Sequence, residues 1–290
     1  MNDELIALVE RASAQTAPWL GQKRQLALRL FDRLAAGDTA LLADWQTDPD
    51  LGVEQVTSRG GGDLVEQPLL NAAPQFSELL QENLMEKALA WQGNQENAAH
   101  LALLNGGRFL YVPDGTERPA PVVLAGEHSH PNVHDLILVG AGATVTIIDD
   151  QPMATTKPSF HATELLLGER AHVNFYQLSD FGARVSRQVV ACYQAQYSQL
   201  AVTTVLGSRP AQVTRLTNWL DGQGAQADYQ LLSLVDEDSF PQIEPGFKTA
   251  GPAAGVQFSQ RAFAEPMALV KVLAATAPRI MVDRVSQRFY

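Results

Sequence analysis

Residues 140–147 read Gly-Ala-Gly-Ala-Thr-Val-Thr-Ile, and residues 168–175 read Gly-Glu-Arg-Ala-His-Val-Asn-Phe, so the second stretch begins 28 positions after the first. Looser copies begin at Gln199 and Gly224. A repeat period in this range is typical of stacked units, each of which buries its inward side chains against the same positions of its neighbours. The spacing would fit one turn of a β-helix, which we expect here, with a sandwich of evenly spaced strands as the alternative.

Short β-rich runs continue on both sides of these copies, separated by glycines or polar turn residues. No segment between them is long enough and periodic enough to be a crossover helix, which excludes a doubly wound α/β sheet. The expected strands are 109–112, 121–124, 136–139, 144–148, 164–167, 172–178, 189–193, 200–205, 213–219 and 229–235.

Helical periodicity flanks these strands on both sides. Apolar residues at helical spacing predict N-terminal helices over 4–14, 18–37, 76–91 and 94–104, with a polar loop over 46–72 that contains Gly60, Gly61 and Gly62. Pro266 and Pro278 stand at first-turn positions of a C-terminal helical hairpin that runs to Phe289.

The predicted fold class is therefore mainly β: a right-handed parallel β-helix (solenoid) flanked by an N-terminal helical region and a C-terminal helical hairpin. We expect three segments, which are the helical region 1–105, the β-helix core 106–262 and the helical segment 263–290.

Composition excludes several classes of function. The formal net charge is −11, and the Lys and Arg residues are scattered, which argues against a nucleic-acid partner. No apolar run approaches the length of a membrane span. The single cysteine, Cys192, cannot form an internal disulfide, as is usual in the reducing cytoplasm, where we expect the protein to act. It lies in an apolar strand, where a free cysteine is usually a small buried hydrophobe rather than a thiolate ligand or nucleophile.

Three histidines cluster between two expected strands. His128, His130 and His134 have a spacing that could gather imidazole ligands around a divalent metal ion. The alternative is a solvated loop whose histidines bind nothing, which we favour because no supporting partners can be identified from the sequence. Two acidic groups, Asp149–Asp150 and Asp236–Asp238, could serve carbohydrate chemistry on a β-helix, but solvated turns explain them more simply.

The C-terminal hairpin has an apolar face that could bind a partner or dock on the protein's own core. Sequence alone leaves these two possibilities balanced. The candidate partner-binding residues are Met267, Leu269, Val272, Leu273, Ile280 and Val285.

The layout of helices, β-helix and closing helices resembles the SufB/SufD family of iron–sulfur cluster assembly proteins, especially its SufD members. The N-terminal helix resembles a family pattern, and the stretch before the first strand is similar to the one that leads into the family's β-helix. Two of the repeat copies match its first rungs. These stretches are Pro18–Leu34, Leu101–Gly115, Val139–Asp149 and Glu164–Val173.

The chain also departs from the family. Family members are usually longer, and near the C-terminus they often carry Lys-Cys-Ser-His-Gly-Ala, whose histidine is implicated in cluster assembly. Residues 248–253 read Lys-Thr-Ala-Gly-Pro-Ala here, so that Thr249 and Gly251 occupy the cysteine and histidine positions. Neither residue is an iron ligand of the kind that clusters need.

The resemblance implies a scaffold subunit of the SUF assembly complex, not an enzyme. It would pair through the β-helix with a SufB-like protein, or with a second copy of itself, and its hairpin would dock a SufC-like ATPase. It would hold no cofactor stably by itself, although a transient iron–sulfur cluster in the complex is compatible with this role. The rival hypotheses are a β-helix enzyme acting on polysaccharides and a stand-alone metal-binding protein that uses the three clustered histidines.

Overall fold

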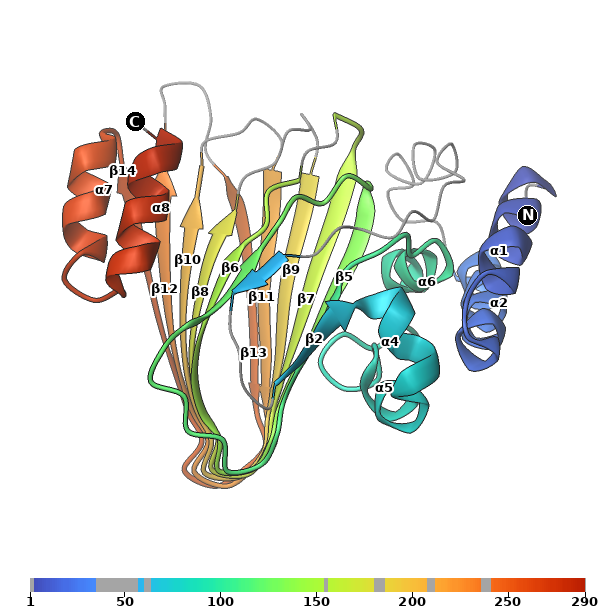
Figure 1. Cartoon of the computed structure of the whole chain (residues 1–290), viewed down its shortest axis with the longest axis horizontal. Coiled ribbons are helices and arrows are strands. Elements are labelled where there is room, and N and C mark those ends of the chain that lie inside the picture. Colours follow the sequence, from blue (N-terminus) through green and yellow to red (C-terminus); the bar gives the residue numbers. More distant parts are fainter. Residues whose placement is uncertain are drawn as a thin grey trace.

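The computed structural model of the chain describes residues 3–34, 57–59, 64–153, 156–179, 186–207, 212–235 and 241–289. Over these residues a pair of seven-stranded sheets forms a β-solenoid, with N-terminal helices on one side and a C-terminal helix pair on the other (Figure 1). The strands are β1 (Thr57–Arg59), β2 (Val65–Pro68), β3 (Arg108–Val112), β4 (Val122–Ala125), β5 (Asn132–Val139), β6 (Thr144–Asp150), β7 (Ser159–Leu167), β8 (His172–Ser179), β9 (Ser186–Gln194), β10 (Gln199–Leu206), β11 (Gln212–Leu220), β12 (Gln226–Leu234), β13 (Gln242–Thr249) and β14 (Gly255–Phe263). The helices are α1 (Asp3–Ala14), α2 (Pro18–Arg33), α4 (Leu69–Gln75), α5 (Ser77–Asn83), α6 (Gln95–Ala102), α7 (Pro266–Leu273) and α8 (Arg279–Phe289).

The strands alternate between the two sheets along the chain. The even sheet has the order β1-β4-β6-β8-β10-β12-β14, and the odd sheet has the order β13-β11-β9-β7-β5-β3-β2. Within the solenoid all neighbouring strands are parallel, whereas β1 and β2 pair antiparallel with β4 and β3. The predicted parallel β-helix is thus confirmed, and the alternative of a sandwich is wrong.

The sequence repeat corresponds to one turn of this solenoid. Thr144 pairs with His172, His172 with Gln199, and Gln199 with Gln226, so equivalent positions of successive copies stack in register. Because each copy stacks on the next, inward side chains form continuous columns along the solenoid.

Tight turns join the sheets at the narrow end of the solenoid (Figure 1). Each tight turn contains one residue with a left-handed backbone conformation. The backbone N–H of that residue donates to a carbonyl of the next tight turn, except in the last turn, which has no successor. Three of these six positions hold glycine, and an open turn tolerates another residue at the others at a cost of about 1–2 kcal/mol. The left-handed residues are Gly115, Gly142, Arg170, Tyr197, Gly224 and Ala253.

Apolar side chains form three layers that hold the elements together. One fills the solenoid between the sheets, one lies between the odd sheet and the N-terminal helices, and one lies between the even sheet and the α7–α8 pair. The predicted C-terminal hairpin is therefore present, and it covers the outer face of the even sheet (Figure 1).

The two strands at the open end of the solenoid were missed by the sequence prediction. The expected strands ended at residue 235, but β13 and β14 add a further turn. Their side chains are mostly exposed or half-buried and polar, and Pro245 lies within β13. A terminal turn has neighbours on one side only, so it lacks the hydrophobic pattern by which the inner strands were recognised.

The N-terminal region differs from the prediction in two places. The helix expected over 76–91 ends at Asn83, and the polar loop expected over 46–72 contains β1, β2 and the start of α4. The triple glycine at 60–62 and the acidic group Asp236–Asp238 lie outside the described residues. The helix expected over 94–104 is α6, capped by the Asn94 side chain. None of the described helices has the length and apolar character needed to cross a membrane.

Candidate functional site

The interior of the solenoid is apolar toward the tight turns and polar toward the opposite end of the strands. In the odd sheet, His161, Gln188 and Thr214 stack in register. In the even sheet, Asp149, Gln177 and Thr204 do the same, and all six side chains are buried. Several of them carry buried oxygens with no hydrogen-bond partner among the described residues, including Gln177 Oε1 and Gln188 Oε1. Buried polar atoms without a partner are uncommon, so this part of the interior is where a functional group is to be sought.

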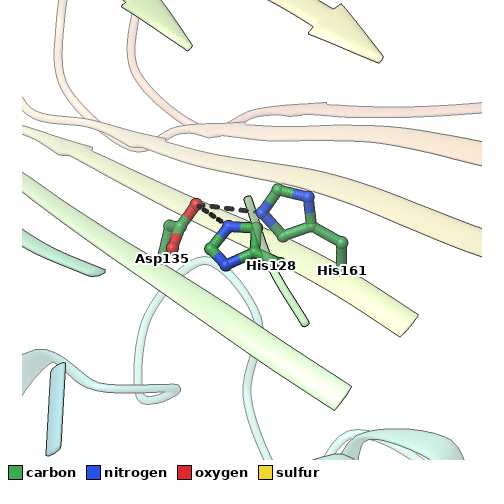
Figure 2. Close-up of side chains that lie close together, drawn as sticks. All are labelled: His128, Asp135 and His161. Carbon is green, nitrogen blue, oxygen red and sulfur yellow. Dashed lines mark hydrogen bonds and ion pairs between the residues drawn. The ribbon is translucent and has the colours of Figure 1, made fainter. Parts of the chain in front are cut away.

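One carboxylate organises the first turns of this polar interior. Asp135, on β5, receives a hydrogen bond from His161 Nε2 on β7 at 2.9 Å and lies 3.6 Å from His128 Nε2. Figure 2 shows both imidazoles directed at the same carboxylate oxygen, Oδ2. The other oxygen, Oδ1, accepts the backbone N–H of Arg108 at 2.7 Å. All three side chains of this group, His128–Asp135–His161, are buried.

A second carboxylate is linked to the first by an amide. Gln151 Nε2 donates to Asp135 Oδ2 at 3.0 Å and to Asp149 Oδ1 at 2.8 Å. Burial would raise the pKa of Asp135, but the charge and hydrogen bonds of His128 and His161 hold that pKa well below its usual range. Burial, together with the negative charge of Asp135, raises the pKa of Asp149. Two carboxylates with opposite pKa shifts therefore share one buried amide.

A separate row of hydrogen-bonded side chains, which includes two histidines, lies on the outer face of the odd sheet, under the N-terminal helices. Asn132 contacts His100, His100 Nε2 lies 2.9 Å from His134 Nδ1, and His134 Nε2 donates to Glu164 Oε2 at 3.1 Å. The Asn132 amide N–H₂ donates to the His100 carbonyl, so Asn132 Oδ1 must accept from His100 Nδ1.

The hydrogen bond to Asn132 places the proton of a neutral His100 on its Nδ1 atom. A neutral His100 then accepts at Nε2 from His134 Nδ1, and the other ring nitrogen of His134 contacts the Glu164 carboxylate. Burial and the nearby His134 lower the pKa of His100 well below its usual value, which agrees with a neutral His100. This row of hydrogen-bonded side chains anchors the helical region to the sheet, because the Glu164 carboxylate also accepts hydrogen bonds from the backbone N–H groups of Met85 and Leu89.

The three histidines singled out from the sequence are not gathered into one group. His128 joins Asp135 and His161 inside the solenoid, whereas the imidazole of His134 is hydrogen-bonded to His100 on the outer face of the odd sheet. His130 lies in the connection before β5, beside Ser129. Among the described residues, the group His128–Asp135–His161 is where three His, Cys, Asp or Glu side chains bring their ligand atoms within 4.8 Å of one another. Whether any of the histidines binds a metal stays a prediction.

The repeat period contained the signal for the residues that were missed. Asp135 and His161 were not selected, because they are 26 positions apart in the sequence. Stacking the sequence at one turn of the solenoid places His161 beside Val133, two residues from Asp135 and on the same face of the sheet. The same operation places Gln177 beside Asp149.

Other sequence hypotheses are resolved by burial. Cys192 is buried as expected, and burial raises the pKa of its thiol to about 12. Asp149 and Asp150 are also buried, so interpreting them as a solvated turn is wrong. Asp149 points into the solenoid group, whereas Asp150 pairs with Arg284 and Arg288 of α8.

The hairpin residues proposed as a partner surface occupy different positions. Leu269, Leu273 and Val285 are buried against the even sheet, and Val272 and Ile280 are half-buried beside them. Met267 is 49% exposed. Of the six candidates, Met267 is therefore the one that a partner can reach most readily.

The last turn of the solenoid leaves two sheet edges open. β13 ends the odd sheet and β14 ends the even sheet, and no described strand pairs with their outer sides. At the opposite end, the antiparallel strands β1 and β2 close both sheets. Open edges of parallel strands are sites where another chain can add strands.

No family model matches the chain. A curated relative, the iron–sulfur cluster assembly protein SufD of Bacillus subtilis (strain 168), is 26% identical over 152 residues, which cover 50% of this chain and 34% of the relative. The match agrees with the resemblance of the sequence motifs and with the β-solenoid between flanking helices. The chain is therefore similar to a SufD protein over half of its length.

The chain spans about a third of the relative's length in this match. Thr249 and Gly251, which the resemblance places at the family's cysteine and histidine positions, lie at the end of β13 and in the turn that follows it. A Cβ atom on Gly251 would lie 2.2 Å from the carbonyl oxygen of Gly222 in the preceding turn. The stacking of the last two turns therefore leaves no room for a side chain at the histidine position.

Proposed function

We propose that this protein is a non-catalytic scaffold subunit of an iron–sulfur cluster assembly complex. In this proposal the open last turn, formed by β13 and β14, pairs with a SufB-like protein or with a second copy of the chain. The C-terminal hairpin docks a SufC-like ATPase. The open pair of sheet edges is the observation that carries the proposal, and the similarity to the Bacillus relative supports the assembly role.

The backbone of β14 is suited to strand addition. Gly255 donates to Ala225 and Phe263 accepts from Val235, so the backbone groups of these residues face β12. Because backbone groups alternate along a strand, those of the even-numbered residues 256, 258, 260 and 262 point outward. β14 has no proline, whereas Pro245 interrupts the donor row of β13, so we expect pairing to run mainly along β14.

A proline at an outward position of β14 tests the pairing. Gln260→Pro removes one outward N–H and leaves the hydrogen bonds to β12 in place. We expect an affinity for the partner chain, or for a second copy, at least about 10-fold weaker, since one lost hydrogen bond and its steric clash together exceed 1.4 kcal/mol. Analytical ultracentrifugation and co-purification with the SufB-like protein measure it.

The matched control for this experiment is Gln260→Ala, which keeps the N–H and should pair like the natural chain. The melting temperature of each variant, measured at a protein concentration too low for the chains to associate, shows whether the substitution has destabilised the folded monomer. Equal affinity of the proline variant, the alanine variant and the natural chain would contradict pairing through β14.

The hairpin offers a second, independent contact. Met267 is a large apolar side chain on the exposed face of α7, although the helix buries its opposite face. We expect Met267→Asp to weaken binding of a SufC-like ATPase at least about 10-fold, because hot-spot side chains at interfaces contribute more than 1.4 kcal/mol each. The control is Lys271→Asp, an exposed charge reversal on the same helix. Binding lost equally in both variants, or in neither, would refute a role for Met267.

Cluster chemistry in the complex requires thiolates from elsewhere. The one cysteine of this chain is buried, and burial raises the pKa of its thiol to about 12. Iron–sulfur clusters are held mainly by thiolates. We therefore propose that the chain holds no cluster by itself and that any cluster built in the complex is a transient cargo held by the partner. The polysaccharide-enzyme alternative has less support, since the carboxylates at 149 and 150 are buried.

A further inference from the structure

We propose that His128, Asp135 and His161 bind a divalent first-row transition metal ion inside the β-solenoid. This inference goes beyond the scaffold role, because it concerns a resident ion of this chain and not the cluster that a complex would assemble. It rests on the geometry of the buried group and on the polar side chains around it.

The ligand atoms are already gathered. One carboxylate oxygen, Asp135 Oδ2, lies 2.9 Å from His161 Nε2 and 3.6 Å from His128 Nε2, and the three ligand atoms lie within 4.8 Å of one another (Figure 2). Ligands bound to one ion at about 2.0–2.1 Å in a tetrahedral arrangement are separated by just over 3 Å. Small side-chain movements would therefore suffice to place an ion between the two imidazoles and the carboxylate.

The chemistry of the donors selects the class of metal. Two imidazole nitrogens and one carboxylate oxygen suit Zn²⁺, Fe²⁺ or Co²⁺, whereas Ca²⁺ and Mg²⁺ prefer all-oxygen sites. Three protein ligands leave at least one coordination position open. The site cannot recruit the thiol of Cys192, because that side chain packs in the apolar part of the interior.

The surroundings support the ligands as metal sites require. The Arg108 backbone N–H fixes Asp135 Oδ1, which leaves Oδ2 directed at the histidines. A second buried carboxylate, Asp149, is joined to Asp135 through Gln151, so negative charge is concentrated where a cation would lie. Hydrogen-bonded outer partners of this kind orient metal ligands.

Unpartnered amide oxygens point to a missing donor near the group. Gln151 Oε1 and Gln177 Oε1 are buried and have no hydrogen-bond partner among the described residues, although the nitrogen of each amide donates to a carboxylate. A narrow void lined by His161, Asp149, Gln151 and Gln177 adjoins these oxygens. The void has no room for a water molecule as it stands, so water bound to an ion at the open coordination position would reach these oxygens only after the lining side chains move apart. The alternative is a set of ion pairs that binds no metal.

The first experiment uses the natural chain alone. After removal of bound metal with a chelator, the chain is titrated with Co²⁺ and with Zn²⁺, followed by absorption and calorimetry. We expect one equivalent of each ion to bind, with Co²⁺ giving a four- or five-coordinate spectrum that lacks a thiolate charge-transfer band. Absence of binding at micromolar metal would overturn the proposal and leave the ion pairs as the explanation of the group.

The second experiment locates the site. Asp135→Asn keeps the oxygen that accepts from Arg108, and His161→Gln keeps a polar side chain of similar reach. We expect each to weaken Zn²⁺ binding at least about 100-fold, because loss of a ligand exceeds the 10–100-fold effect of losing an outer partner. His172→Gln, an exposed histidine on β8, is the control and should bind normally.

A rise in melting temperature on adding Zn²⁺ should occur in the natural chain and in the control, but not in the two site variants. Unchanged Zn²⁺ affinity in folded Asp135→Asn and His161→Gln would place the metal elsewhere and overturn the assignment. All of these measurements use the isolated chain, so their result is independent of whether the chain pairs with an assembly partner.

Discussion

Replacing Glu164 by glutamine is expected to destabilise the protein by about 3–5 kcal/mol, the range observed when one member of a buried ion pair is removed. Glu164 is fully buried, and its carboxylate accepts from Met85 N at 2.6 Å, from Leu89 N at 2.9 Å and from His134 Nε2 at 3.1 Å. Glutamine has one acceptor oxygen for these three donors, and its amide N–H₂ would face either a backbone N–H or the His134 ring nitrogen.

Two measurements separate this effect from a general loss of packing. Urea unfolding gives the free energy of unfolding, and hydrogen exchange reports on the amides of Met85 and Leu89, which we expect to lose protection before the strands of the solenoid do. The matched control is Glu169→Gln, which sits in the turn after the same strand and is only partly buried, so its effect should stay within about 0.5 kcal/mol. Equal stability of the two variants would show that His134 and the 85–89 segment do not depend on the carboxylate.

Glu164 also explains why the helix expected over 76–91 was wrong beyond Asn83. Apolar residues continue at helical spacing through Leu84, Met85 and Leu89, and the local pattern predicts a continuous helix. In the structure the Met85 and Leu89 amides donate to a side chain about eighty residues away, and Met85 takes a left-handed backbone with φ of 55°. A long-range hydrogen bond that replaces local ones leaves no mark on the periodicity of the segment.

The solenoid was predictable because its information is repeated. Each inner strand buries side chains on both faces, and each copy must match its neighbours, so the pattern recurs every turn. The terminal strands β13 and β14 match a neighbour on one side only, and their exposed polar sequence resembles a loop. Prediction from the sequence was thus strongest where turns stack on both sides and weakest at the open end on which the proposed pairing depends.

The polar group inside the solenoid was only partly predictable. His128 was selected for its proximity to other histidines along the chain, whereas its partners lie on the next two odd-sheet strands, at Asp135 and His161. Neighbours in a solenoid are one turn apart, so closeness along the chain misleads for any site that spans turns. Such sites are found by aligning the sequence at the repeat period. Looking for similar residues that are close together in the sequence does not find them.

Among glycine-to-alanine substitutions, we expect the largest loss of stability at Gly107. Its φ of 123° is a conformation that other residues rarely adopt, and a Cβ atom there would lie 1.9 Å from the His134 carbonyl oxygen. Backbone strain of about 1–3 kcal/mol and overpacking of about 1–3 kcal/mol together predict that Gly107→Ala loses about 2–6 kcal/mol or does not fold. Urea unfolding and the yield of folded protein measure the loss.

Gly115→Ala separates the two contributions. Gly115 also has a positive φ, 66°, but a Cβ atom there would meet nothing within 4 Å, so only the conformational cost of about 1–2 kcal/mol applies. The difference between the two variants measures the close approach of Gly107 to β5, where the chain enters the solenoid and where Arg108 N–H reaches Asp135. If both variants lost the same stability, β5 would be able to move away from residue 107. The carbonyl of His134 and the adjoining Asp135 would then not be held rigidly, and the geometry on which both buried histidine groups depend would be adjustable instead of fixed by the fold.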